Sequence, residues 1–135
     1  MSFITTLQPD EIFVFGSNLA GIHGAGAARQ ALECFGAKWG VGRGMTGRSY
    51  AFPTKDEQLC TRMLHELEEE VIMLYAVARN YPDFTFLVTP VGCGLAGYHP
   101  SQVAPLFLNQ LVPDNVRLPS EFTGVPEVEE SEAAT

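Results

Sequence analysis

Two glycine-rich segments carry the residue types best suited to binding a ligand. In the first, residues 15–28, a strand end leads through a glycine-rich loop into the start of a helix. Such a loop lets backbone N–H groups approach a phosphate, and the helix dipole favours the negative charge. Asn18 could bind a ribose hydroxyl, and His23 could act as a general acid or base. The candidate binding residues here are Gly16, Ser17, Asn18, Gly21, Gly24, Gly26 and Ala27.

The second segment follows the most apolar run of the chain and precedes another predicted helix. Its candidate binding residues are Gly92, Cys93, Gly94, Leu95, Ala96, Gly97 and Tyr98. This loop could wrap a diphosphate, and Tyr98 could stack on a ring or simply be a half-buried aromatic residue. Cys93 occupies a nucleophile's usual place after a strand. The G-x-C-x-G elbow is missing, however, because residue 91 is Val, and this disfavours a catalytic cysteine.

Other motifs do not assemble into a known site. Residues 42–47 match GxGxxG, but a predicted strand follows instead of a helix, so a Rossmann dinucleotide site is not expected. The histidines at 23, 65 and 99 and the three cysteines lack metal-ligand or disulfide spacing. We therefore expect neither a metal nor another cofactor.

The net charge of −8 argues against general nucleic-acid binding. Residues 34–55 nevertheless contain no acid and four of the eight Lys and Arg residues. An acidic protein with such an interval can still offer one electropositive pocket to a small anion. Residues 119–135 carry five acids and no base, and we expect them to form a flexible acidic tail after a single domain of residues 1–118.

Apolar runs and glycine turns predict four strands that alternate with three helices. The predicted strands are 11–15, 49–53, 84–90 and 115–118, and the predicted helices are 24–35, 57–80 and 100–111, with Ser101 as the N-cap of the last. The glutamates at 66, 68, 69 and 70 are expected to form a solvated helix face. Alternation of this kind predicts an α/β/α three-layer sandwich with a mostly parallel central sheet. Both glycine-rich loops follow strands, so they could converge at the carboxyl edge of that sheet.

In order and spacing, three segments resemble the macrodomain family. They are residues 15–28, residues 47–53 (GRSYAFP) and residues 88–98 (VTPVGCGLAGY), and the resemblance covers about residues 11–118. This similarity is to small, divergent macro-like members. It implies a macrodomain-like α/β/α sandwich that binds ADP-ribose or a related nucleotide, and some members of the family hydrolyse ADP-ribose linkages.

The resemblance also implies roles for individual residues. Asn18 matches the family's asparagine near the distal ribose, and Gly24, Gly26 and Ala27 match its glycine-rich segment beside that ribose. Residues 92–98 match the loop that holds the diphosphate. The chain departs from the family where an aspartate in a Gly-Asp-Ile/Val motif reads the adenine amine, since no such motif precedes residue 11. Cys93 also replaces a usual Thr, and His23 replaces a common glycine.

Three hypotheses about function stay open at this point. The chain could hydrolyse an ADP-ribosyl bond, with Asn18 orienting the ribose and His23 as acid or base. It could instead be a non-catalytic module that reads or sequesters a nucleotide signal or an ADP-ribosylated macromolecule. In the third, it is an interaction protein whose acidic tail makes the contact. No signal peptide or membrane span is predicted, so the expected location is the cytoplasm. The oligomeric state is left open.

Overall fold

Helices and strands alternate along the part of the chain that the structure describes. The computed structural model describes residues 4–125. In chain order its elements are β1 (Glu11–Asn18), α1 (Gly26–Cys34), β2 (Gly44–Thr46), β3 (Ser49–Lys55), α2 (Leu64–Asn80), β4 (Thr85–Val88), α3 (Pro100–Leu108), β5 (Val116–Arg117) and α4 (Ser120–Thr123). None of the helices in residues 4–125 has the length and apolar character needed to span a bilayer.

The strands form one mixed sheet in the order β2-β3-β1-β4-β5. β1 pairs in parallel with β3 and β4, and β4 pairs in parallel with β5. The hairpin of β2 and β3 is antiparallel. This confirms the predicted α/β class and mostly parallel sheet. The sequence missed β2 within the glycine-rich interval, because a three-residue edge strand has no apolar run of its own and depends on pairing with β3.

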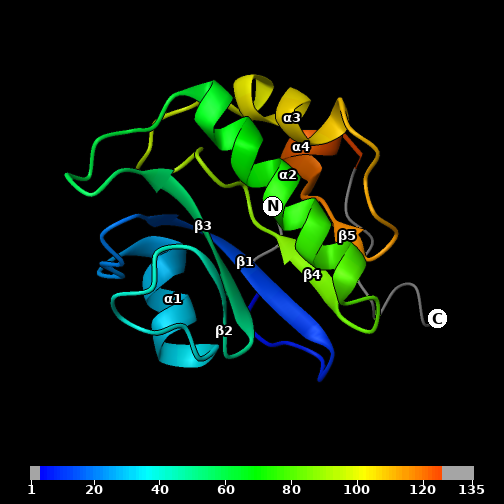
Figure 1. Cartoon of the computed structure of the whole chain (residues 1–135), viewed down its shortest axis with the longest axis horizontal. Helices are drawn as coiled ribbons and strands as arrows, with labels where there is room; N and C mark the ends of the chain where they lie inside the picture. The colour runs from blue at the N-terminus through cyan, green and yellow to red at the C-terminus, as the bar shows by residue number, and fades with distance from the viewer. Residues whose placement is uncertain (1–3, 126–135) are drawn as a thin grey trace.

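Both faces of β1 are buried, which explains its unbroken apolar run. Ile12 and Val14 face the larger core cluster, whereas Phe13 and Phe15 face a smaller one. In Figure 1, α1 lies on one side of the sheet and α2, α3 and α4 lie on the other. The small cluster includes residues of α1, and the large cluster includes residues of the other three helices.

All three predicted helices differ from the prediction at their N-terminal ends. α1 begins at Gly26 instead of residue 24. α2 begins at Leu64 instead of residue 57, because residues 56–60 form a turn and Thr61 bridges to Lys55. The side chain of Glu66 accepts a hydrogen bond from the Met63 amide at the start of this helix, at 2.9 Å. α3 is capped by His99, not by Ser101, since the His99 side chain accepts a hydrogen bond from the Ser101 amide.

The packed domain also extends past residue 118, which corrects the predicted start of the tail. Residues Ser120–Thr123 form α4, and Phe122 is buried against Phe107 with ring centroids 5.2 Å apart. Proline and glutamate near this segment predicted a flexible chain, but one large aromatic side chain is enough to anchor a single helical turn. Residues 126–135, with four of the five tail acids, lie outside the described residues.

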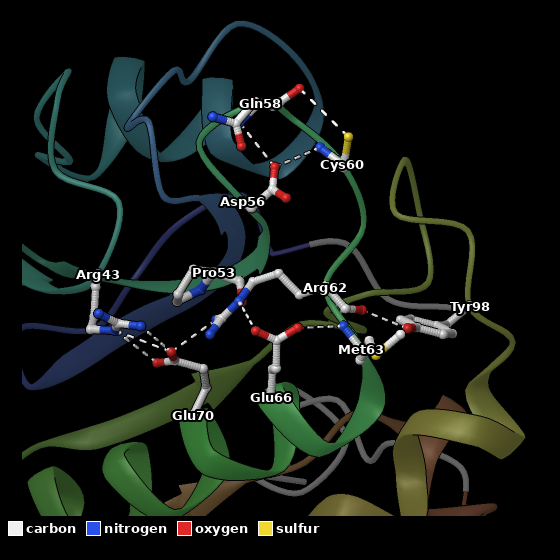
Figure 2. A network of polar contacts seen from close by, with 10 residues as sticks. All are labelled: Arg43, Pro53, Asp56, Gln58, Cys60, Arg62, Met63, Glu66, Glu70 and Tyr98. Carbon is white, nitrogen blue, oxygen red and sulfur yellow. Dashed lines mark hydrogen bonds and ion pairs between the residues drawn. The ribbon is translucent and has the colours of Figure 1, made fainter.

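Glu70 overturns the prediction that the whole glutamate run is solvated. Its side chain is 2% exposed and accepts hydrogen bonds from Arg43 and Arg62, the latter at 2.9 Å (Figure 2). Arg62 is itself buried and also donates to the Pro53 carbonyl. The hydrogen bond to Glu70 raises the pKa of Arg43. This cluster joins α2 to the end of β3 and to the loop before β2.

Replacing Glu70 should therefore reduce the stability of the fold far more than replacing its neighbour Glu69. We expect Glu70→Ala to lower the free energy of unfolding by about 3 kcal/mol, because the buried Arg62 guanidinium loses its hydrogen-bonded carboxylate and keeps only the longer ion pair to Glu66, at 3.9 Å. Glu69→Ala, on the exposed face of the same helix, is the matched control and should change it by less than about 0.5 kcal/mol. Urea unfolding curves of both variants test this. Equal losses would show that the buried ion pair does not stabilise the fold.

Candidate functional site

A cavity of about 520 Å³ lies where the segments that follow β1, β3 and β4 meet. These strands run parallel, so their carboxyl ends reach the same edge of the sheet. The cavity is lined by Gly16, Ser17, Asn18, Ile22, Gly24, Ala25, Gly26, Ala27, Ala28, Thr54, Lys55, Leu59, Thr89, Pro90, Val91, Gly92, Gly94, Leu95 and Ala96. The two glycine-rich loops thus line one cavity, as their positions after strands predicted.

Most of the predicted binding residues line this cavity. From the first segment these are Gly16, Ser17, Asn18, Gly24, Gly26 and Ala27, and from the second they are Gly92, Gly94, Leu95 and Ala96. Gly21, His23, Cys93, Gly97 and Tyr98 were also predicted, but they are not among the lining residues.

The side chain of Asn18 fixes the first loop. Its Nδ2 donates to the Ile22 carbonyl at 2.8 Å, and its Oδ1 accepts from the Ile22 amide at 2.9 Å. Gly21 lies within this loop at a φ of +73°, and a Cβ there would stand 2.3 Å from the carbonyl carbon of Gly40. Asn18 therefore lines the cavity while both of its polar atoms hold the loop. Because Gly21 has no side chain, its backbone can lie close to the backbone of Gly40.

Backbone amides on opposite sides of the cavity have no hydrogen-bond partner within residues 4–125. In the second loop these are the amides of Gly92, Gly94 and Leu95, together with that of Ala96. On the other side, no side chain caps the amides in the first turn of α1. The N-cap residue is Ala25, which has no polar side chain, and the first turn contains no acidic residue. Unpartnered amides at a helix N-terminus and in a glycine-rich loop are the groups that bind phosphate oxygens.

The charge of the cavity also favours an anion. Lys55 is the one charged residue among the described lining residues, and no Asp or Glu lines the cavity. No salt bridge to Lys55 occurs within residues 4–125. In the same part of the chain, no three His, Cys, Asp or Glu side chains gather into a metal-binding group.

The other polar side chains of the lining already donate to the backbone. Ser17 donates to the Gly42 carbonyl at 2.6 Å, Thr54 to the Ser17 carbonyl at 3.3 Å, and Thr89 to the Val14 carbonyl at 2.8 Å. Together with Asn18, these groups shape the cavity instead of presenting a nucleophile or a base. A general base supplied by these described lining side chains would have to be Lys55.

His23 is buried beneath a neighbouring loop and does not line the cavity. Its Nε2 lies 3.0 Å from both the Lys38 and the Val41 carbonyl oxygens, so this nitrogen carries the hydrogen and donates. Its ring is 1% exposed and meets the edge of the Phe15 ring. This position gives His23 a structural role, and it does not support the predicted role as acid or base.

Tyr98 is also held away from ring stacking in the cavity. Its hydroxyl donates to the Arg62 carbonyl at 2.5 Å, and its ring packs beside the large core cluster. Nearby, the Thr61 hydroxyl donates to the Ala96 carbonyl at 2.8 Å. These two bonds tie the second glycine-rich loop to the segment that follows β3.

That segment supplies the wall that the sequence did not predict. Thr54, Lys55 and Leu59 line the cavity from the end of β3 and the turn after it. The sequence did contain a signal for Lys55, because this residue closes the acid-free interval and lies at the end of a third strand, which is parallel to β1. Leu59 gave no such signal, since its placement depends on the turn.

Cys93 is poorly suited to be a nucleophile. Its thiol contacts the Val91 carbonyl at 3.6 Å and packs against the large core cluster. Burial raises the pKa of this thiol to about 11, and the negative charge of Glu121 adds to the rise. The reactive thiolate is therefore a minor species at neutral pH.

This difference predicts selective alkylation of the cysteines. At pH 8 about one in a thousand Cys93 side chains is a thiolate, whereas Cys34 and Cys60 are exposed. We expect iodoacetamide to label Cys34 and Cys60 while less than about a tenth of Cys93 reacts. The rate at Cys93 should then rise with pH toward 11. Peptide mass spectrometry measures all three sites. Labelling of Cys93 as fast as Cys34 would contradict the buried, protonated thiol.

Comparisons with protein-family models, with curated proteins and with solved structures find no match to this chain.

Proposed function

We propose that this chain binds ADP-ribose or a related nucleotide derivative in the cavity between the two glycine-rich loops. One observation carries this proposal: unpartnered amides from both loops line one acid-free cavity beside Lys55. A diphosphate suits this arrangement, because its oxygens can accept from amides on both sides while Lys55 offsets its charge. The sheet with helices on both faces supports the same macrodomain-like sandwich that the sequence resembles.

Binding without hydrolysis is the form of this function that the cavity favours. Four polar side chains of the lining are bonded to the backbone, and His23 lies outside it. Hydrolysis needs a positioned water and a group that accepts its proton. We therefore favour a module that reads or sequesters its ligand over an ADP-ribosyl hydrolase.

Calorimetric titration with ADP-ribose tests the proposal directly. We expect a saturable heat from the unsubstituted chain, and affinity about fivefold weaker in Lys55→Ala, because one favourable charge is lost. Lys38→Ala is the matched control, since it removes an equal charge from an exposed residue outside the cavity. It should change the affinity by less than about twofold.

A second variant tests the amides. A Cβ at Gly94 would meet no atom within 4 Å and the residue has no positive φ, so we expect Gly94→Glu to fold normally. Its carboxylate would occupy the anion site and repel the ligand, and we expect affinity to fall at least about tenfold. No heat from a folded chain at millimolar ADP-ribose would contradict the proposed function. Release of ADP-ribose from an ADP-ribosylated peptide, lost in Asn18→Ala, would instead favour the hydrolase hypothesis.

A further inference from the structure

The turn between β3 and α2 holds a leucine in an unfavourable backbone conformation. The Asp56 carboxylate accepts hydrogen bonds from the amides of Gln58 and Cys60, at 2.9 and 3.0 Å (Figure 2). The Asp56 amide in turn donates to the Cys60 carbonyl at 2.8 Å. Between these residues Leu59 adopts a φ of +66°, and every other positive φ within residues 4–125 belongs to a glycine.

Packing within the fold does not account for this leucine. Leu59 is 44% exposed and belongs to neither core cluster, although it lines the cavity. Glycine or asparagine would adopt the same backbone conformation more easily. Strain that the core does not require is typical of residues that contact ligands.

Leu59 is one of three large exposed aliphatic side chains that line the cavity. Ile22 is 40% exposed and comes from the first loop, whereas Leu95 is 76% exposed and comes from the second. The lining side chains with hydrogen-bonding groups, apart from Lys55, are already bonded to the backbone. Outside its phosphates, a bound ligand would therefore meet mainly aliphatic carbon.

We infer that Leu59 is a ligand-contacting residue that packs against the sugar or base of a phosphate-bearing nucleotide. This inference rests on the proposed function and makes it more specific. The site takes nucleoside diphosphate derivatives by holding their phosphates with amides and Lys55. It recognises the base by apolar contact and shape, and it does not read the base edge through hydrogen bonds. Adenine is then accepted without being required.

The variant Leu59→Gly separates ligand contact from a role in the fold. Glycine relieves the positive φ, so the melting temperature should equal or exceed that of the unsubstituted chain. Affinity for ADP-ribose should fall about fivefold, because the aliphatic contact is lost. Leu59→Met keeps an aliphatic side chain and should bind within about twofold. Leu111→Ala, at an 83% exposed leucine outside the cavity, should change neither quantity.

A second measurement compares bases on the unsubstituted chain. The analogue of ADP-ribose with hypoxanthine in place of adenine exchanges the amino group for a carbonyl and keeps the ring shape. We expect its dissociation constant to lie within about threefold of that for ADP-ribose, since among the described lining side chains only Lys55, assigned to the phosphates, is free to hydrogen-bond.

The outcomes distinguish this inference from the proposed function. ADP-ribose binding that Leu59→Gly leaves unchanged would overturn the inference alone. A melting temperature that falls together with affinity would make Leu59 a packing residue, with the same consequence. Discrimination above about tenfold against hypoxanthine would overturn recognition by shape. If the unsubstituted chain binds neither compound, the proposed function fails and the inference fails with it.

Discussion

The parallel pairing of β1 with both β3 and β4 is the constraint on which the cavity depends. It carries three strands to one edge of the sheet, so the segments after residues 18, 55 and 88 must leave the sheet together. The central strand can hold this position because apolar side chains bury both of its faces. The separation of the two glycine-rich loops along the chain therefore does not separate them in space.

Hydrogen bonding at this edge is divided between side chains and backbone. The polar side chains of the lining other than Lys55 form hydrogen bonds with neighbouring backbone groups. They are those of Ser17, Asn18, Thr54 and Thr89. Four amides of the second loop, at residues 92, 94, 95 and 96, and those of the first turn of α1 are left unpartnered within the described residues. A rigid loop with free amides costs little reorganisation when an anion binds. The same division leaves few groups for acid–base chemistry, which is why we propose binding in preference to hydrolysis.

The segment between β3 and α2 links this site to the core. The Arg62 guanidinium is buried with Glu70, while the Arg62 carbonyl accepts a hydrogen bond from Tyr98 at the end of the second loop. Beside it, Thr61 bonds to Ala96 and the Asp56 turn presents Leu59 to the cavity. One short connection thus anchors two walls of the cavity to α2. The stability of this connection depends on the buried Arg62–Glu70 ion pair, because the loss of either partner would leave the other charge buried and poorly paired.

Local patterns determined the outline of this protein. The apolar run of β1, the helical period of α2 and the glycines after the strands predicted an α/β chain with two converging loops. Glu70 was within reach of the same reasoning, because it lies three residues after Leu67 and four before Leu74 on the buried stripe. Phe122, by contrast, lies in a segment whose composition resembles a tail, and only its contact with Phe107 identifies it as core.

Tertiary structure alone decided which site residues reach the cavity. Residues 23 and 24 are adjacent in the sequence. The His23 side chain nevertheless bonds to the backbone of residues 38 and 41, whereas Gly24 lines the cavity. Leu59 lies on the cavity wall because a carboxylate three residues earlier closes a turn around it. The sequence by itself determined four of the five strands, the glycine turns and the acid-free interval, since each depends on neighbouring residues. The burial of a charge and the direction of a side chain depend on partners distant along the chain, and only the folded structure brings those partners together.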